Sequence, residues 1–254
     1  MFNQTRNDAL KKSSTTPPYT FIIKPLTSIV TLIATLLIMV APASVMAANH
    51  GVSAAAPMTL YIVRHGQTDW NLQGRIQGDT DNPLNETGLD QARTVAEQLG
   101  AITLDHVYPS GLQRAIQTAE AIAGDAPITS DVRLNERSRG IYEGQVAAEV
   151  NDAFRPRFSA LDDDMDGGES LRSIAERISE ATRDIVDRHM GETVMVVGHS
   201  GVNPLVIAEL IGLSPERAIN EIRQGNDEVY KLTVFPNGAV TIWKLIPESR
   251  LEEL

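Results

Sequence analysis

Residues 60–68 read Leu60-Tyr61-Ile62-Val63-Arg64-His65-Gly66-Gln67-Thr68, a short apolar run that ends in a cation, an imidazole and a glycine. Four consecutive apolar residues, two of them β-branched, predict a buried central strand with Arg64 and His65 at its carboxyl end. In open α/β sheets, ligands bind at that edge. Partners for His65 are therefore expected at the ends of other strands.

Strands and helices alternate along the rest of the chain. Apolar spacing predicts helices over about 86–99, 111–123, 145–158, 170–189 and 203–211. Strands are predicted at 106–108, 193–197, 229–235 and 239–246, with a shorter one around Ile128 and Val132. The turn residues Pro236-Asn237-Gly238 join the last two strands as a hairpin. This order predicts an α/β fold with a mostly parallel central sheet, helices on both faces and a C-terminal β-hairpin.

The first 47 residues differ from the rest and are predicted to be a secretory signal peptide. Their only acid is Asp8, residues 26–41 carry no charge, and Val45-Met46-Ala47 supplies the small residues that a signal peptidase reads. A helix over 26–41 spans about 24 Å, short of the roughly 30 Å hydrocarbon core, which favours cleavage. Export to a bacterial periplasm is the prediction, and an uncleaved anchor in the inner membrane through 26–41 is the alternative.

The remaining residues divide into a flexible lead-in, 48–57, and one domain, 58–254. The whole chain has 22 Lys and Arg against 33 Asp and Glu, a net charge of −11, and removal of the basic N-terminal segment makes it more negative. Such a charge disfavours nucleic acid and anionic membrane surfaces as partners. Cysteine is absent, which excludes disulfides and thiolate metal sites.

Cationic and imidazole side chains gather at the predicted strand ends. His65 and His199 each end a strand beside glycine, and a third strand leads into Arg114. Histidines can hold a metal ion, but Arg64 and Arg114 would repel a cation. One planar guanidinium group can donate two parallel hydrogen bonds to two oxygens of a phosphate, so an anion site is the better interpretation.

Two other motifs receive structural interpretations. Gly198-His199-Ser200-Gly201-Val202 is similar to a serine hydrolase elbow, but the final glycine is missing and no histidine follows Ser200. The acids of 162–166 imitate the first half of a calcium loop, yet Ser173 stands where the bidentate acid belongs. A solvated acidic loop that borders the pocket mouth is expected there.

The side chains of Arg137 and Arg139 are expected to lie in solvent or in ion pairs.

Four motifs in order resemble the histidine phosphatase superfamily, in its phosphoglycerate mutase-like branch. The matching residues are Arg64-His65-Gly66 with Thr68 and Trp70-Asn71, then Ser110-Gly111-Leu112-Gln113-Arg114 through Ala119, then Glu136 with Gly140 and Glu143-Gly144, and finally Gly198-His199-Ser200-Gly201. The resemblance covers most of residues 58–212 and implies a three-layer α/β/α sandwich.

What the resemblance implies is hydrolysis of a small phosphomonoester in two in-line steps, with neither metal nor cofactor. His65 corresponds to the nucleophile that becomes a phosphohistidine, and Glu136 to the proton donor. Arg64, Arg114 and His199 correspond to the groups that hold the phosphate oxygens. Further substrate contacts are expected from Asn71, Thr68, Gln77, Ser200 and Gly201. A backbone carbonyl near Gly66 is expected to hold the second ring nitrogen of His65.

Two alternatives remain open at this point. A phosphoglycerate mutase-type phosphotransferase uses the same chemistry, and a non-catalytic phosphate-binding module can share the fold. Retention of all the matched catalytic positions favours an enzyme, and the compact chain favours a phosphatase. The sequence does not indicate the oligomeric state or the physiological substrate.

Overall fold

Five strands form one sheet in the order β2-β3-β1-β4-β5 in the computed structural model, which describes residues 55–100 and 102–246. The strands are β1 (Met58–Arg64), β2 (His106–Pro109), β3 (Thr193–Gly198), β4 (Val229–Val234) and β5 (Val240–Leu245). β3 pairs in parallel with both β1 and β2, whereas β4 pairs antiparallel with both β1 and β5. Four strands of this sheet therefore run in one direction, and β4–β5 is the predicted hairpin. The predicted signal or anchor segment lies outside the described residues.

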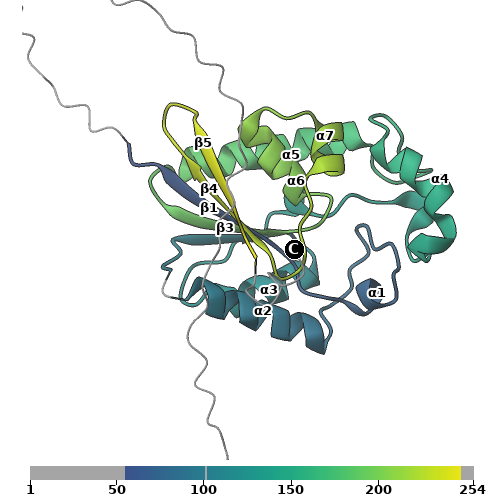
Figure 1. The fold of residues 1–254 in the computed structure, drawn as a ribbon, viewed down its shortest axis with the longest axis horizontal. Coiled ribbons are helices and arrows are strands. Elements are labelled where there is room, and N and C mark those ends of the chain that lie inside the picture. Colours follow the sequence, from purple (N-terminus) through teal and green to yellow (C-terminus); the bar gives the residue numbers. More distant parts are fainter. Residues whose placement is uncertain (1–54, 101, 247–254) are drawn as a thin grey trace, which may run out of the picture.

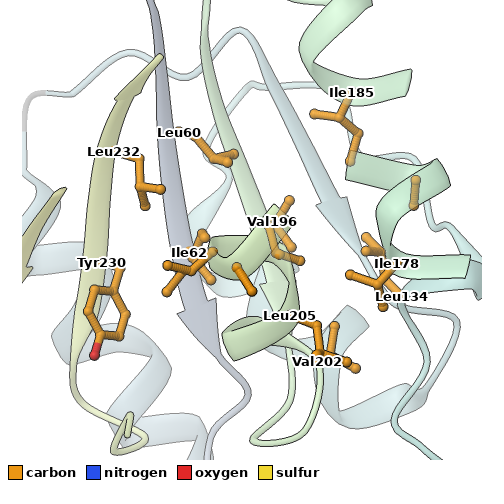
Figure 2. Close-up of a cluster of buried hydrophobic side chains, with 14 of the residues drawn as sticks. Leu60, Ile62, Leu134, Ile178, Ile185, Val196, Val202, Leu205, Tyr230 and Leu232 are labelled. Atoms are coloured by element: carbon orange, nitrogen blue, oxygen red, sulfur yellow. The ribbon is translucent and has the colours of Figure 1, made fainter. Parts of the chain in front are cut away.

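The sheet is covered on both faces, which confirms the predicted three-layer arrangement (Figure 1). Helices α5 (Leu171–Arg188), α6 (Asn203–Ile211) and α7 (Pro215–Glu221) cover one face, and α2 (Glu86–Leu99) and α3 (Gln113–Ile122) cover the other. Successive residues of β1 point to opposite faces. Leu60 and Ile62 pack among the side chains of α5 and α6 (Figure 2), and Tyr61 and Val63 pack toward α2 and α3. All four are buried, as a central strand requires.

Local signals account for where α2 begins and ends. The Asn85 side chain accepts a hydrogen bond from the Gly88 N–H at 2.9 Å, which satisfies one of the free donors of the first turn. Gly100 follows the helix with φ of 54°, a conformation that favours glycine. The predicted limits of this helix are confirmed.

Shorter elements lie beyond the carboxyl edge of the sheet, where α1 and α4 stand apart from the three layers (Figure 1). They are α1 (Asp69–Leu72), η1 (Val132–Leu134), η2 (Gly140–Tyr142) and α4 (Ala147–Ser159). A small apolar cluster of Ile76, Tyr142 and Met165, backed by Phe154 of α4, holds part of this region together. Part of the site is therefore enclosed by segments that pack in this small cluster rather than in the main core.

One expectation was wrong. The short strand around Ile128 and Val132 does not form: Ile128 makes one isolated bridge to Val107, and Val132 begins η1, which the Asp131 side chain caps. That the acidic loop borders the pocket mouth stays a prediction: none of residues 162–166 lines the cavity itself, and their carboxylates face arginines of neighbouring segments. Arg157 pairs with Asp163 at 2.8 Å, and Arg172 pairs with Asp162 at 2.7 Å.

Helix α7 was not predicted. Its start is a recognisable signal, because Ser214 caps the Arg217 N–H and Pro215 occupies the first turn. Its seven residues are too short for an apolar period to stand out. Within the described part of the chain, none of the helices combines the length and apolar character needed to cross a bilayer.

Candidate active site

Three parallel strands end side by side, and the residue that follows each one enters the site. His65 follows β1, Ser110 follows β2 and His199 follows β3. The His65 and His199 ring centroids lie 5.0 Å apart, with the rings tilted by 54°. The two histidines that the sequence places at strand ends are thus neighbours at one edge of the sheet.

The ring of His65 is held by its own neighbouring backbone. Its Nδ1 lies 2.7 Å from the Gly66 carbonyl oxygen, and because a carbonyl only accepts, Nδ1 carries the proton. The expected carbonyl contact is therefore confirmed, and the neutral ring keeps its lone pair on Nε2. Gly66 must be glycine here, since a Cβ would lie 2.3 Å from the Gly88 carbonyl oxygen.

Burial and positive neighbours keep His65 neutral. The side chain is 3% exposed, and burial together with His199, Arg114 and Arg64 holds its pKa well below the ordinary value of histidine. His199 is fully buried and its pKa is lowered in the same way, first by burial and then by Arg114 and Arg64. Both imidazoles are therefore uncharged at neutral pH.

Two arginines are held by backbone carbonyls, and each keeps its buried Nε without a partner among the described residues. Arg114 donates to the carbonyls of Thr80 and Gly78, both at 2.8 Å. Arg64 donates to the Gln224 carbonyl at 3.0 Å. The Nε atoms of Arg64 and Arg114 are buried and have no hydrogen-bond partner within the described residues.

His199 adds a further donor of the same kind. The Ser110 hydroxyl accepts from the Leu112 N–H and lies 2.8 Å from His199 Nε2. When that hydroxyl donates to Nε2, the neutral ring carries its proton on Nδ1, another buried atom without a partner in the described chain. Buried donors that protein groups leave unsatisfied fit an anion with several acceptor oxygens.

Glu136 is the acid of the site and is itself surrounded by donors. Its Oε1 accepts from the Arg137 N–H at 2.8 Å and from Arg139 Nη2 at 3.1 Å, and its Oε2 accepts from the Gly201 N–H at 3.0 Å. Burial alone would raise the pKa of this carboxyl. Arg139, the two backbone N–H groups and Arg114 outweigh burial, so the pKa lies below its ordinary value. Glu136 is consequently ionised when the site holds no anion.

The neighbouring arginines have different surroundings. Arg139 is 5% exposed, faces the cavity and pairs with Glu136, while its Nη1 has no partner among the described residues. Arg137 instead donates to the carbonyls of Glu169, Phe158 and Asp163 and so ties loops together. Arg139 was not predicted to be a site residue; the available signal was its spacing of three residues from Glu136.

A cavity of about 420 Å³ opens over these groups. Of the expected substrate contacts, Asn71, Gln77 and Ser200 line it. Thr68 does not: it is fully buried, caps α1 and lies 2.9 Å from Gln77 Oε1, to which it donates. Gly201 is also not part of the lining, and it donates to Glu136 instead.

The outer part of the cavity is formed by other elements. From α4 it receives Asn151, Phe154, Arg155 and Phe158, and from α7 and the chain after it Asn220 and Arg223. Arg139 lies over the Phe158 ring at 4.6 Å, which joins the outer wall to the inner site.

A polar network that reaches the cavity wall at Gln224 was not anticipated from the sequence. Gln224 and Asn203 are both buried and contact the backbone of β1. Their partners are mainly main-chain carbonyls, which leave no residue-type signal in a sequence. Asn203 does stand at the start of a predicted helix, a position that gave no hint of this contact.

Comparisons with known proteins give matches over most of the chain. The family model described as histidine phosphatase superfamily (branch 1) matches residues 60–244. A phosphoglycerate mutase-like protein from Arabidopsis thaliana is 40% identical over 205 residues, or 76% of this chain and 87% of that protein. A metal-independent phosphoserine phosphatase from the same plant is 40% identical over 153 residues, 56% of this chain and 64% of that protein. The structure of a phosphoserine phosphatase variant from Entamoeba histolytica in complex with phosphoserine superposes with a TM-score of 0.65 at 28% identity, covering 73% of this chain and 94% of that one.

The electrostatics of His65 can be measured directly. We expect its ring to stay neutral as the pH falls through about 6.5, the ordinary pKa of histidine, because burial and positive neighbours disfavour its charged form. NMR titration of the histidine Cε1 resonances measures this. Arg64→Met should raise the His65 pKa because it removes a positive neighbour. Titration of His65 near 6.5 in the unaltered protein would contradict the electrostatic argument.

Proposed function

Because the chain belongs to the histidine phosphatase superfamily (branch 1), we propose that it hydrolyses small phosphomonoesters through a phosphohistidine on His65. The observation that carries the proposal is the convergence of a neutral, oriented His65 with the unsatisfied donors of Arg64, Arg114 and His199. A phosphate group satisfies those donors and brings its phosphorus to the nucleophile. Relatives that are phosphatases support hydrolysis as the reaction class.

The first step is an in-line displacement at phosphorus. His65 Nε2 supplies the electron pair that forms the N–P bond, and the bond from phosphorus to the leaving oxygen breaks. Arg64, Arg114 and His199 stabilise the negative charge on the three non-bridging oxygens. In the second step water attacks phosphorus, the N–P bond breaks, and His65 regains its lone pair.

Glu136 acts on the proton in both steps. It gives a proton to the leaving oxygen and then accepts one from the attacking water. Its lowered pKa means that the proton has to arrive with the substrate, since the second pKa of a phosphate is about 6. A monoanionic ester delivers that proton, and its negative charge favours protonation of the nearby carboxylate.

A mutase is the alternative, and it is supported by several of the relatives, whose names give a phosphoglycerate mutase or a mutase-like protein. The two reactions share the phosphohistidine and differ in whether water or an acceptor hydroxyl takes the phosphoryl group. We favour hydrolysis because the cavity opens to solvent along exposed residues of α4 and α7, which admits water to the intermediate. We also propose that the protein works after export, as the first 47 residues predict.

The lining of the cavity favours a leaving group with its own negative charge. Six arginines line the cavity, against Glu136 as the one carboxylate from the described residues. A monoanionic phosphate ester and ionised Glu136 together balance two of those charges. Arg155 and Arg223 stand on the outer wall and are exposed, so they can reach a carboxylate on the leaving group.

His65→Ala is expected to abolish turnover of a generic phosphomonoester, because it removes the nitrogen that forms the bond to phosphorus in the proposed mechanism. The wild type, quenched in alkali during turnover of a ³²P-labelled ester, should retain label on His65. His106→Ala is a matched control and should leave the rate unchanged. His106 stacks on Tyr108 and begins β2, at the end of that strand away from the site. Full activity of His65→Ala would contradict the mechanism.

Glu136→Gln is expected to lower kcat/KM by roughly 10² to 10⁴ for an alkyl phosphate, whose leaving oxygen needs a proton. The loss should be much smaller for p-nitrophenyl phosphate, because nitrophenolate leaves without one. In the wild type, kcat/KM for the alkyl ester should fall as the pH rises above about 6, where the substrate loses its proton. Equal losses for the two esters would argue against a proton-donor role.

Charge recognition at the outer wall is tested with substrates that differ in one group. Wild-type kcat/KM should be higher for 3-phosphoglycerate, which carries a carboxylate, than for glycerol 3-phosphate, which does not. Arg155→Gln should lower the first value by roughly tenfold and leave the second within about twofold. Arg93→Gln, which removes an exposed arginine on α2, should change neither. An equal fold-decrease in kcat/KM for both substrates would show that Arg155 does not recognise the carboxylate of the leaving group.

A further inference from the structure

We infer that Gln224 and Asn203 form a clamp that positions Arg64 for phosphate binding. The inference rests on the proposed function, because it assigns Arg64 to the phosphate site. Neither clamp residue is a reacting group. Both act through the backbone of β1 and the turn that carries His199.

Gln224 uses every hydrogen-bonding group of its side chain. Its Nε2 donates to the carbonyls of Ile62 and Glu228, at 2.8 and 2.9 Å, and its Oε1 accepts from Asn203 Nδ2 at 2.8 Å. The side chain thereby fixes the segment before β4 against β1. The main-chain carbonyl of the same residue accepts the hydrogen bond from Arg64 Nη1 at 3.0 Å. The side-chain hydrogen bonds of Gln224 therefore hold its main-chain carbonyl in place, and that carbonyl holds the Arg64 guanidinium.

Asn203 joins the clamp to the turn after β3. It is 1% exposed and begins α6, and its Nδ2 also donates to the Val63 carbonyl at 3.0 Å. Its own N–H donates to the His199 carbonyl at 2.9 Å. Gly198 leaves room for this amide, because a Cβ there would lie 2.3 Å from Asn203 Oδ1. Asn203 thus links the backbone of His199 to β1, the strand that carries Arg64.

Two more bonds tie His65 to the same framework. The His65 N–H donates to the Gly198 carbonyl at 3.0 Å, and the Asn226 side chain donates to the His65 carbonyl. Asn226 lies two residues beyond Gln224 on the same segment. A shift of this segment would move the partners of Arg64 and His65 together.

This arrangement reduces the freedom of Arg64 before substrate arrives. A long arginine side chain has many rotamers, and one fixed donor keeps the guanidinium in a single orientation with Nε free. Without the clamp, phosphate binding has to order the side chain as well. The clamp should therefore be seen in phosphate affinity, and the part of its effect that passes through Arg64 should disappear when Arg64 is replaced.

The test is a double-mutant cycle on inorganic phosphate binding, measured by ³¹P NMR titration. Gln224→Met keeps the side-chain size and removes its hydrogen bonds, and it should raise the Kd for phosphate by roughly tenfold. In an Arg64→Met background the same change should raise Kd by less than about twofold, because the group it positions is gone. Gln98→Met on α2 is the matched control and should leave Kd unchanged.

The outcomes separate the clamp from the proposed function. If Arg64→Met alone leaves phosphate binding intact, the phosphate site itself is wrong. If Arg64→Met weakens binding but Gln224→Met has no effect, or the two effects multiply independently, the clamp is overturned. Should Gln224→Met unfold the protein, Asn203→Leu removes the amide donors with little change in shape and without adding a charge. Its effect on Kd must show the same dependence on Arg64.

Discussion

The hydrogen bond from His65 Nδ1 to the Gly66 carbonyl is the contact on which the rest of the site depends. It forms between adjacent residues, so the backbone at the end of β1 determines which ring nitrogen carries the proton. That backbone can take its course because Gly66 and Gly88 approach without side chains between them. A buried, neutral ring with one free nitrogen follows from this geometry, and neighbouring arginines add to the neutrality that burial imposes.

The arginines can be buried because other groups already satisfy part of each guanidinium. Backbone carbonyls hold Arg64 and Arg114, and Glu136 neutralises Arg139. The cost of burying a charge falls when it is hydrogen-bonded. The donors that remain unsatisfied are the ones available to an anion, so the same contacts that stabilise the empty site also define its ligand. Glu136 takes part in both functions, since its low pKa depends on the cations that a phosphate would partly neutralise.

The sequence predicted the elements with strong periods or clear caps, including β1, α2 and the hairpin, because their signals are local. It also placed His65, His199 and Arg114 at one sheet edge, because parallel strands bring their carboxyl ends together. It did not find Gln224. That segment reaches the site only because β4 runs antiparallel to β1, which puts the beginning of β4 beside the end of β1. The importance of Gln224 comes from contacts with backbone carbonyls, which sequence patterns do not record. Thr68 was expected to contact substrate. In the structure it instead caps α1 and donates to Gln77, which lines the cavity.

Helix α4 shows why the phosphate-binding residues could be predicted from the sequence and the residues of the outer cavity could not. This helix forms the outer wall of the cavity, and none of its residues is buried. It packs through partly buried side chains, Phe154 against a cluster separate from the two main cores and Phe158 against one of those cores. Residues such as Asn151 and Arg155 can therefore change with little cost to the sheet or to the phosphate site. The groups that hold phosphate are constrained by the fold, whereas the groups that face the leaving group are constrained only by the substrate. A motif therefore identifies the chemistry of this chain, and its choice of ester must be read from the side chains of α4 and the segment after α7.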